Sequence, residues 1–380
     1  MKKLEVLEFI KSRPDWENVL KAEPYCLNVS RAEWNGHRLV MLKYSQFNSS
    51  FAEKMVRESR GLIFDEDTFK PVSVPFFKFM NFGEPNADEI DWSKSPYVLE
   101  KKDGSLIKIV KYDGRILIST NGLILASEAR LAPQPGCIFS TYEDLVRWAL
   151  EKRLGPDPLK KISDLIPEGR TYMFELCTPF NRVVIPSAEP EIWFIGVRDN
   201  GTMEETFILD DPLSKVFKTP KLYGFSTFDS CIKTAKALPW TAEGYVVTSR
   251  DFRRVKVKSL AYLSCHALAG NGVMTYERAI SLMRLNETSE VIAYFPNFKE
   301  VFYEIERRIS LFLHELDIEW HEFAERGMLN AVRSVQAEWI KKNFVHTGAA
   351  FAMLNRKIAG FREWFDSLPD SVAADIVKKI

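Results

Sequence analysis

The sequence predicts an α+β protein with a mixed, largely antiparallel domain over residues 1–266 and an all-helical domain over residues 267–380. From about residue 60 to 265, short runs of β-branched and aromatic residues alternate with turn dipeptides, which is typical of antiparallel strands. After Gly270-Asn271-Gly272 the apolar spacing changes from two residues to about 3.6, the period of an α-helix. A chain of 380 residues is long enough for two such domains.

Turn dipeptides separate the strands predicted in the first domain. Asp113-Gly114 lies between the apolar runs 105–112 and 115–120, and this arrangement predicts a tight hairpin. Asn200-Gly201 predicts a second hairpin in the same way, between 191–198 and 202–209. The remaining elements of this domain are predicted to be strands at 172–177 and, as a pair around Asp251, within 244–258, and a helix at 141–154.

A long helix dominates the second domain. Asn297 lies three residues before Glu300, a spacing that resembles a capping box, and apolar residues from Val301 to Phe323 fall on one helical face. Further helices are predicted at 329–344, at 349–365 and near the C-terminus.

Composition narrows the function classes. Lys plus Arg and Asp plus Glu are both 52, so any polyanion must be bound by local patches of charge. The five cysteines are widely spaced and include no C-x-x-C pair, which disfavours structural zinc and a disulfide framework. The N-terminus lacks an apolar signal region, and no apolar run approaches the roughly 18 residues of a membrane span. We therefore expect a cytoplasmic protein, or one of the host cytoplasm if a phage encodes it.

A lysine stands at the mouth of the first hairpin, in Lys101-Lys102-Asp103-Gly104-Ser105. A lysine that is partly desolvated or lies near other cations can act as a nucleophile. Taken alone, this stretch favours a basic surface turn over a reactive lysine. Asp103, a short acceptor beside glycine, is expected to order the turn.

Further charged residues stand at the borders of apolar runs, in this order: Arg60, Lys78, Glu175, Glu243, Lys256 and Lys258. The last two alternate with valines, so they face the same side of a strand, roughly 7 Å apart. Nucleotidyl transfer requires cations to neutralise a triphosphate and carboxylates to hold Mg²⁺ directly or through water. The chain has no G-x-x-x-x-G-K-[ST] sequence, which excludes a P-loop.

These motifs, in this order and spacing, resemble the T4 RNA ligase 1 family, within the covalent nucleotidyltransferases that include ATP-dependent ligases and capping enzymes. The resemblance covers about residues 55–266. It is carried by Ser59-Arg60-Gly61, Lys78-Phe79 with Asn81, Lys101 to Leu106, Phe174-Glu175 with Pro179 and Asn181-Arg182, Glu243-Gly244-Tyr245-Val246, and Lys256-Val257-Lys258-Ser259 with Tyr262 and His266.

The resemblance implies that residues 1–266 form an adenylyltransferase domain in which Lys101 attacks ATP and retains AMP. AMP would then pass to an RNA 5′-phosphate, and an RNA 3′-hydroxyl would displace it to form a phosphodiester. The same resemblance implies that Mg²⁺, or alternatively Mn²⁺, is held by Glu175 and Glu243, directly or through water. It implies ATP-binding roles for Arg60, Lys78, Lys101, Glu175, Glu243, Lys256 and Lys258.

The chain departs from the family at two places. Thr120-Asn121-Gly122 stands where the family has another lysine, so one phosphate contact is missing or comes from Lys102, Lys108 or Arg115. The helical domain, a candidate for RNA specificity, contains no residue that can be aligned with a tRNA contact. The expected substrate is RNA with 5′-phosphate and 3′-hydroxyl ends, with a nicked tRNA as one candidate. RNA or tRNA repair is the expected role, with a separate end-healing enzyme as partner.

Two alternatives remain open at this stage. A DNA ligase or capping enzyme would continue into a five-stranded barrel, whereas the sequence after residue 266 has a helical period. A catalytically silent RNA-binding protein would not need Lys101, the two glutamates and both distal lysines together.

Overall fold

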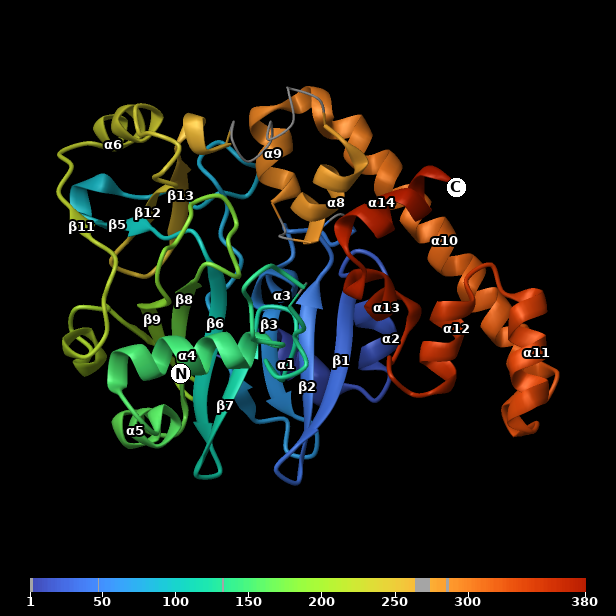
Figure 1. Cartoon of the computed structure of the whole chain (residues 1–380). Coiled ribbons are helices and arrows are strands. Elements are labelled where there is room, and N and C mark those ends of the chain that lie inside the picture. The colour runs from blue at the N-terminus through green and yellow to red at the C-terminus, as the bar shows by residue number, and fades with distance from the viewer. Residues whose placement is uncertain (1–2, 47, 132, 264–273, 285–286) are drawn as a thin grey trace. The chain divides into compact units, whose positions relative to one another are not determined.

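The computed structural model describes residues 3–46, 48–131, 133–263, 274–284 and 287–380 (Figure 1). The chain divides into two compact units, Met1–His266 and Ala267–Ile380, which we call the sheet unit and the helical unit. The prediction of an α+β chain with largely antiparallel sheets and a helical C-terminal region is confirmed. His266 and the Gly270-Asn271-Gly272 break, where the period changes, lie outside the described residues.

Three antiparallel sheets form the sheet unit. Sheet A has the strand order β1-β2-β3-β4, sheet B has β11-β5-β12-β13, and sheet C has β10-β9-β8-β6-β7. The strands of sheet A are β1 (Leu27–Trp34), β2 (His37–Tyr44), β3 (Arg60–Asp65) and β4 (Pro71–Ser73). Those of sheet B are β5 (Tyr97–Lys101), β11 (Leu222–Tyr223), β12 (Gly244–Thr248) and β13 (Arg254–Lys258). Those of sheet C are β6 (Ser105–Tyr112), β7 (Arg115–Thr120), β8 (Arg170–Cys177), β9 (Glu191–Asp199) and β10 (Glu205–Thr206).

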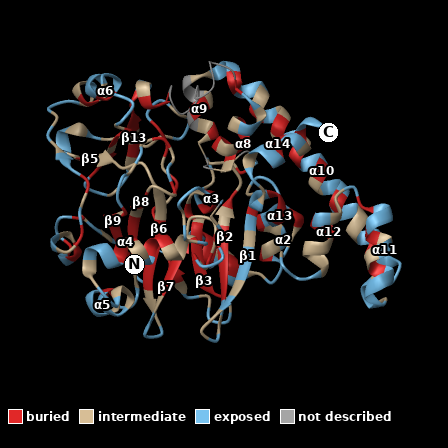
Figure 2. Ribbon diagram, in the orientation of Figure 1, coloured by how far each residue is buried: buried red, intermediate tan, exposed pale blue. Residues whose placement is uncertain are grey.

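The central strands β2 and β3 of sheet A are buried on both faces over most of their length. Leu39 and Met41 of β2 belong to a core shared with Val110 and Leu117 of sheet C, whereas the alternate residues of β2 pack in a second core with the N-terminal helices. Successive side chains of a strand point to opposite faces, so β2 supplies buried apolar residues to both cores. In Figure 2 the red that marks buried residues runs along β3. The helices that lie wholly within the described residues of this unit are α1 (Glu5–Ser12), α2 (Trp16–Lys21), α3 (Lys54–Glu58), α4 (Tyr142–Leu154), α5 (Pro158–Leu165), α6 (Phe228–Lys236) and the short 3-10 turns Trp92–Lys94 and Pro212–Lys215.

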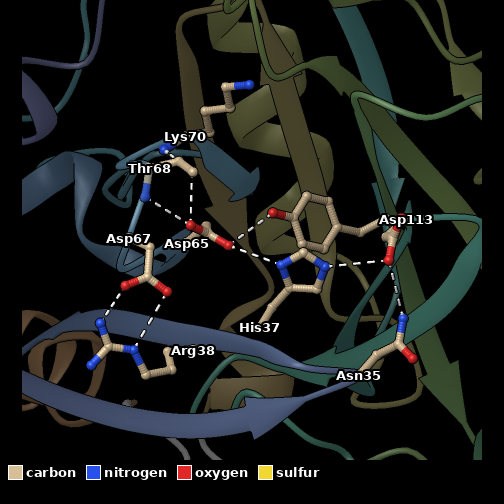
Figure 3. Close-up of polar contacts among 9 residues, drawn as sticks. Asn35, His37, Arg38, Asp65, Asp67, Thr68, Lys70 and Asp113 are labelled. Atoms are coloured by element: carbon tan, nitrogen blue, oxygen red, sulfur yellow. Dashed lines mark hydrogen bonds and ion pairs between the residues drawn. The ribbon is translucent and has the colours of Figure 1, made fainter.

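A polar network joins sheet A to sheet C at the opposite end of β2 from Lys43 (Figure 3). Asp65 Oδ2 accepts from the Tyr112 hydroxyl at 3.0 Å and lies 3.1 Å from His37 Nδ1, while Asp65 Oδ1 accepts from the backbone and hydroxyl of Thr68. Burial alone would raise the pKa of the Asp65 carboxyl, but these hydrogen bonds lower it overall. The network therefore fixes one sheet against the other.

The helical unit is built around one long helix, α10, whose buried face carries Phe302, Ile309 and Leu316 among others. Helix α10 begins at Lys299, directly after a 3-10 turn over Pro296–Phe298. The capping-box prediction is therefore wrong, because Asn297 lies inside that turn and not at an extended position before the helix. The helices are α8 (Tyr276–Arg284), α9 (Thr288–Tyr294), α10 (Lys299–Glu325), α11 (Arg333–Asn343), α12 (Thr347–Leu354), α13 (Phe361–Ser367) and α14 (Asp370–Lys378), with a 3-10 turn at Met328–Asn330.

Two other segments differ from prediction. The predicted helix over 349–365 is interrupted between α12 and α13, where Arg356 has a φ of 55°. The predicted strand over 202–209 is reduced to β10, because the Asp199 side chain accepts from the backbone of Gly201 and Thr202 and holds the chain in a turn. The hairpin of β6 and β7 has the predicted bounds and register.

No helix within the described part of the chain combines the length and the apolar character that crossing a membrane requires.

Candidate active site

Three strand ends of sheet B meet at one point. Strand β5 ends at Lys101, β13 ends at Lys258, and β12 between them begins at Gly244, which pairs in register with both lysines. A Cβ on Gly244 would lie 2.2 Å from the Val257 carbonyl oxygen, and its φ of +137° also favours glycine. Because the backbones of β12 and β13 approach so closely at Gly244, the residue before it, Glu243, lies beside both lysines.

Glu243 forms ion pairs with two lysines through one oxygen. Its Oε1 lies 2.8 Å from Lys101 Nζ and 3.0 Å from Lys258 Nζ. The side chain of Lys258 is 0% exposed and that of Lys101 is 18% exposed, so Lys101 is the amine that an incoming molecule can reach. The second oxygen, Glu243 Oε2, is buried and has no hydrogen-bond partner among the described residues. This oxygen is therefore placed to accept a hydrogen bond from a ligand or to bind a hydrated cation.

Glu175 projects from β8 toward the same point. The side chain is half-buried. This burial raises the pKa of the Glu175 carboxyl to about 7, with Lys101 lowering it and Glu243 and Asp103 raising it further. The carboxyl thus lies within electrostatic reach of Lys101, although the two residues belong to different sheets.

The turn that follows Lys101 is held from several sides. Asp103 Oδ2 accepts from the backbone of Val184 at 2.9 Å and of Ile185 at 2.6 Å, and Asp103 Oδ1 accepts from the Tyr262 hydroxyl at 2.8 Å. Gly104 packs so closely on β8 that a Cβ would lie 2.3 Å from the Leu176 carbonyl oxygen. The Asp103 side chain therefore positions the turn.

Three of the predicted cations gather beside this point, around two aromatic rings. Lys78 Nζ lies 5.5 Å from the Tyr44 ring centroid, while Arg60 Cζ and Lys256 Nζ lie 5.4 and 5.6 Å from the Phe79 centroid. Burial would raise the pKa of the Tyr44 hydroxyl, but the positive charges of Lys78, Arg60, Lys256 and Lys43 lower it overall. We call Lys43, Arg60, Lys78 and Lys256 the cation cluster.

Backbone pairing explains how the cation cluster forms. The segment after Lys78 runs beside β13, with the Lys256 N–H donating to the Met80 carbonyl at 3.0 Å and the Phe82 N–H donating to the Lys256 carbonyl at 2.8 Å. Arg60 starts β3, and its buried Nη1 has no hydrogen-bond partner in the described part of the chain. A buried guanidinium nitrogen without an acceptor favours an anionic ligand at this position.

The structure thus brings all seven predicted site residues together, from strands of three sheets, from the segment after β4 and from the position before β12. It adds Lys43 and Tyr44, which the sequence analysis missed because they follow an apolar run, 39–42, and carry no motif. Only the register between β2 and β3, which pairs Lys43 with Arg60, reveals their position. Lys102 was one candidate to replace the lysine missing at Asn121. Its Nζ instead pairs with Glu100 at 2.8 Å.

The carboxylates suit a hydrated divalent cation. In the described part of the chain no group of three or more His, Cys, Asp or Glu side chains could enclose a metal ion. Mg²⁺ usually keeps several waters and binds through one or two carboxylates together with substrate phosphates. The unpartnered Glu243 Oε2 and the nearby Glu175 carboxyl fit that mode of binding.

Comparisons with known proteins agree with this geometry. The family model described as RNA ligase matches residues 58–262, a span that includes all seven predicted site residues. A candidate bifunctional polynucleotide kinase/RNA ligase of Autographa californica nuclear polyhedrosis virus is 30% identical over 72% of this chain and 40% of that protein. A candidate RNA ligase of Thermovibrio ammonificans is 30% identical over 60% of this chain and 58% of that protein.

The chain therefore spans about half the length of these relatives. Among solved structures, an archaeal ATP-dependent RNA ligase is similar with 12% identity and a TM-score of 0.45, over 75% of this chain and 74% of that chain. This structural likeness is too distant to carry an argument about the site.

Proposed function

Because the chain belongs to the RNA ligase family, we propose that it is an ATP-dependent RNA ligase that works through a covalent lysyl-AMP intermediate. One observation carries the proposal: the reachable amine of Lys101 lies 2.8 Å from Glu243, beside a cluster of cations suited to a triphosphate.

In the proposed first step, the Lys101 ammonium of this ion pair loses one proton to solvent water, and the neutral amine then attacks the α-phosphorus of ATP. A P–N bond forms, the bond to the β-phosphate breaks, and pyrophosphate leaves. Glu243 Oε1 is the base within reach of the proton that the amine loses. Lys258, held at 3.0 Å from the same oxygen, is placed to stabilise the negative charge that develops on the α-phosphate.

The other predicted residues are assigned by position. Arg60, Lys78 and Lys256 of the cation cluster bind the phosphates of ATP, and the unpartnered Arg60 Nη1 supports this role. Glu175 and Glu243 bind the nucleotide and would hold Mg²⁺, or Mn²⁺, through its water shell. A bound divalent cation would supply charge neutralisation on the triphosphate.

Two later steps complete the proposed reaction. An RNA 5′-phosphate takes AMP from Lys101, and an RNA 3′-hydroxyl then attacks this activated end, so that AMP leaves and a phosphodiester forms. The substrate is thus RNA with a 5′-phosphate and a 3′-hydroxyl, and broken RNA, including nicked tRNA, is a source of such ends. Repair would also need an enzyme that converts damaged ends to this chemistry. Location in the cytoplasm, or in the host cytoplasm, stays a prediction of the sequence.

Labelled ATP tests the proposal. The protein is incubated with α-labelled ATP or GTP and a divalent cation, and is then separated by denaturing electrophoresis. A labelled band with ATP, together with sealing of an RNA that has the stated ends, is the expected result. Label from GTP alone would support capping chemistry, and sealing only of DNA would support a DNA ligase. Absence of label from a protein shown by intact mass to carry no AMP would support a silent binding protein.

We also propose that the helical unit contributes to RNA selection and not to adenylylation. The predicted adenylylation residues all lie in the sheet unit, which is a compact unit by itself. A chain ending near residue 270 should therefore still take up AMP while its preference among RNA substrates changes. Loss of AMP uptake by a truncated protein with an intact circular dichroism spectrum would contradict this division.

A further inference from the structure

Lys43 lies at the end of β2, in a strand that carries no recognisable motif. It pairs in register with Arg60 at the start of β3. The register shifts between Leu42 and Lys43, so that Lys43 lies opposite Arg60 and Gly61 is passed over. Both charges act on the same buried amine, because Arg60 and Lys43 each lower the pKa of Lys108. Lys43 therefore lies near an arginine that the proposed reaction uses.

From β2, the Lys43 side chain extends to the turn after β7. Its Nζ lies 3.4 Å from the point where a Cβ on Gly122 would stand. That turn is Thr120-Asn121-Gly122, where the resemblance to the family predicts a lysine and this chain has none. An ammonium group thus reaches this turn from a neighbouring sheet.

Lys43 also acts electrostatically with the rest of the cation cluster. Its charge is one of the four that together lower the pKa of the buried Tyr44 hydroxyl. Concentrated positive charge around a buried ring favours a ligand with several negative charges, such as a polyphosphate.

The other lysine near this turn is less suited to bind phosphate. Lys108 is fully buried, and its Nζ donates to the Gly61 carbonyl. Burial, together with the charges of Arg60 and Lys43, lowers the pKa of Lys108 to about 7. Lys108 is therefore occupied with backbone and is only partly charged near neutral pH.

The remaining candidates face elsewhere. Lys102 Nζ lies 2.8 Å from Glu100 and 3.7 Å from the centroid of the Trp193 ring. Arg115 is exposed and begins β7, next to the Asp113-Gly114 turn. The Asn121 turn follows Thr120 at the other end of the same strand, so Arg115 lies far from it.

We propose that Lys43 binds the β- and γ-phosphates of ATP, the part that leaves as pyrophosphate, and replaces the lysine that this chain lacks at Asn121. Lys101 and Lys258 both pair with Glu243, where the proposed attack on the α-phosphorus takes place. Lys43 and Arg60 belong to sheet A and would contact the phosphates that leave. The inference rests on the proposed adenylylation by ATP.

Separating the reaction into its steps tests this role. Lys43→Ala should raise the KM for ATP in adduct formation by about tenfold or more, because a charge-assisted hydrogen bond to phosphate is lost. Sealing of chemically pre-adenylylated RNA, which contains no pyrophosphate, should stay within about twofold of the wild type. The double variant Lys43→Ala with Asn121→Lys should recover part of the affinity for ATP.

Lys70→Ala serves as the matched control, since Lys70 is exposed on the connection between β3 and β4. It should change neither step. An unchanged KM for ATP in Lys43→Ala, or an equal loss in both steps, would overturn the role of Lys43, while the wild type still forms its adduct. A wild type that forms no adduct and seals no RNA would overturn the proposed function and this inference together.

Discussion

Charged side chains are used differently in the two units. In the sheet unit, buried ion pairs join residues that are far apart in the sequence, such as Glu243 with Lys101 and Lys258. In the helical unit, many of the ion pairs on described residues join positions three or four apart within one helix, and most of their side chains are exposed. Among them are Glu304 with Arg307 and Arg308, Glu322 with Arg326, His321 with Glu325, Arg362 with Asp366 and Asp375 with Lys378.

This contrast supports the proposal that the chemistry takes place in the sheet unit. A buried charge must be compensated by partners in exact positions, and only a tertiary fold supplies them. An exposed pair on a helix needs no such arrangement and contributes little to stability. The sheet unit therefore contains buried charges that the proposed reaction uses, whereas the interior of the helical unit is dominated by apolar and aromatic packing.

The largest effect is expected at Lys101. Lys101→Ala should abolish the covalent AMP adduct, because it removes the only amine of the proposed attack. Lys101→Arg should fail as well, since a guanidinium does not lose its proton near neutral pH. Denaturing electrophoresis after incubation with labelled ATP measures the adduct. Label that persists on either variant would contradict the assignment.

A variant of Glu243 tests how much the buried ion pairs of the sheet unit contribute to stability and activity. Glu243→Gln leaves Lys258, which is 0% exposed, without its charged partner. Breaking such a pair should lower the free energy of unfolding by about 3–5 kcal/mol and impair adduct formation. Glu100→Gln is the control, because Glu100 pairs with Lys102 in a more exposed position, and it should cost less than about 1 kcal/mol. Urea titration measures the free energy of unfolding. An equal loss for the two variants would contradict the distinction between the buried pair and the more exposed pair.

Glu175 should link stability to pH. Its folded pKa of about 7 lies above the ordinary value of 4.5, so in the protein without ATP its contribution is fully present below pH 4.5 and is lost as pH rises through 7. Glu175→Gln lacks this titration, so it should become more stable than the wild type by on the order of 2–3 kcal/mol above pH 7. Denaturant unfolding from pH 4.5 to 8 measures the difference. A difference that does not grow over this range would contradict the placement of Glu175.

The smallest effect is expected on the exposed face of α10. Arg326 pairs with Glu322 at 2.6 Å, with side chains 60% and 50% exposed. Arg326→Ala should lower the free energy of unfolding by about 0.3–0.5 kcal/mol and leave adduct formation unchanged. A loss of adenylylation in this variant would place chemistry in the helical unit and would remove the contrast between the two units.

Local patterns in the sequence predicted much of this fold. The hairpin of β6 and β7 depends on Asp113-Gly114, and the long helix α10 depends on one apolar stripe, so both could be read from short segments. The start of α10 and the break between α12 and α13 depend on turn geometry that residue type alone does not determine.

The site was predictable to the extent that its residues stand in motifs. Lys101, Glu243 and Lys258 could be grouped because each ends or precedes a strand in a recognisable order. Lys43 could not, because its role depends on which residue of β3 it lies opposite, and a shift in register between Leu42 and Lys43 sets that pairing.

The position of AMP on the chain tests the central claim most directly. The protein is incubated with ATP and Mg²⁺, digested, and its peptides are mapped by mass spectrometry before and after addition of pyrophosphate. The account predicts AMP on Lys101 alone, with release when pyrophosphate is added. AMP on the adjacent Lys102, or a chain that shows no AMP under any of these conditions, would contradict it.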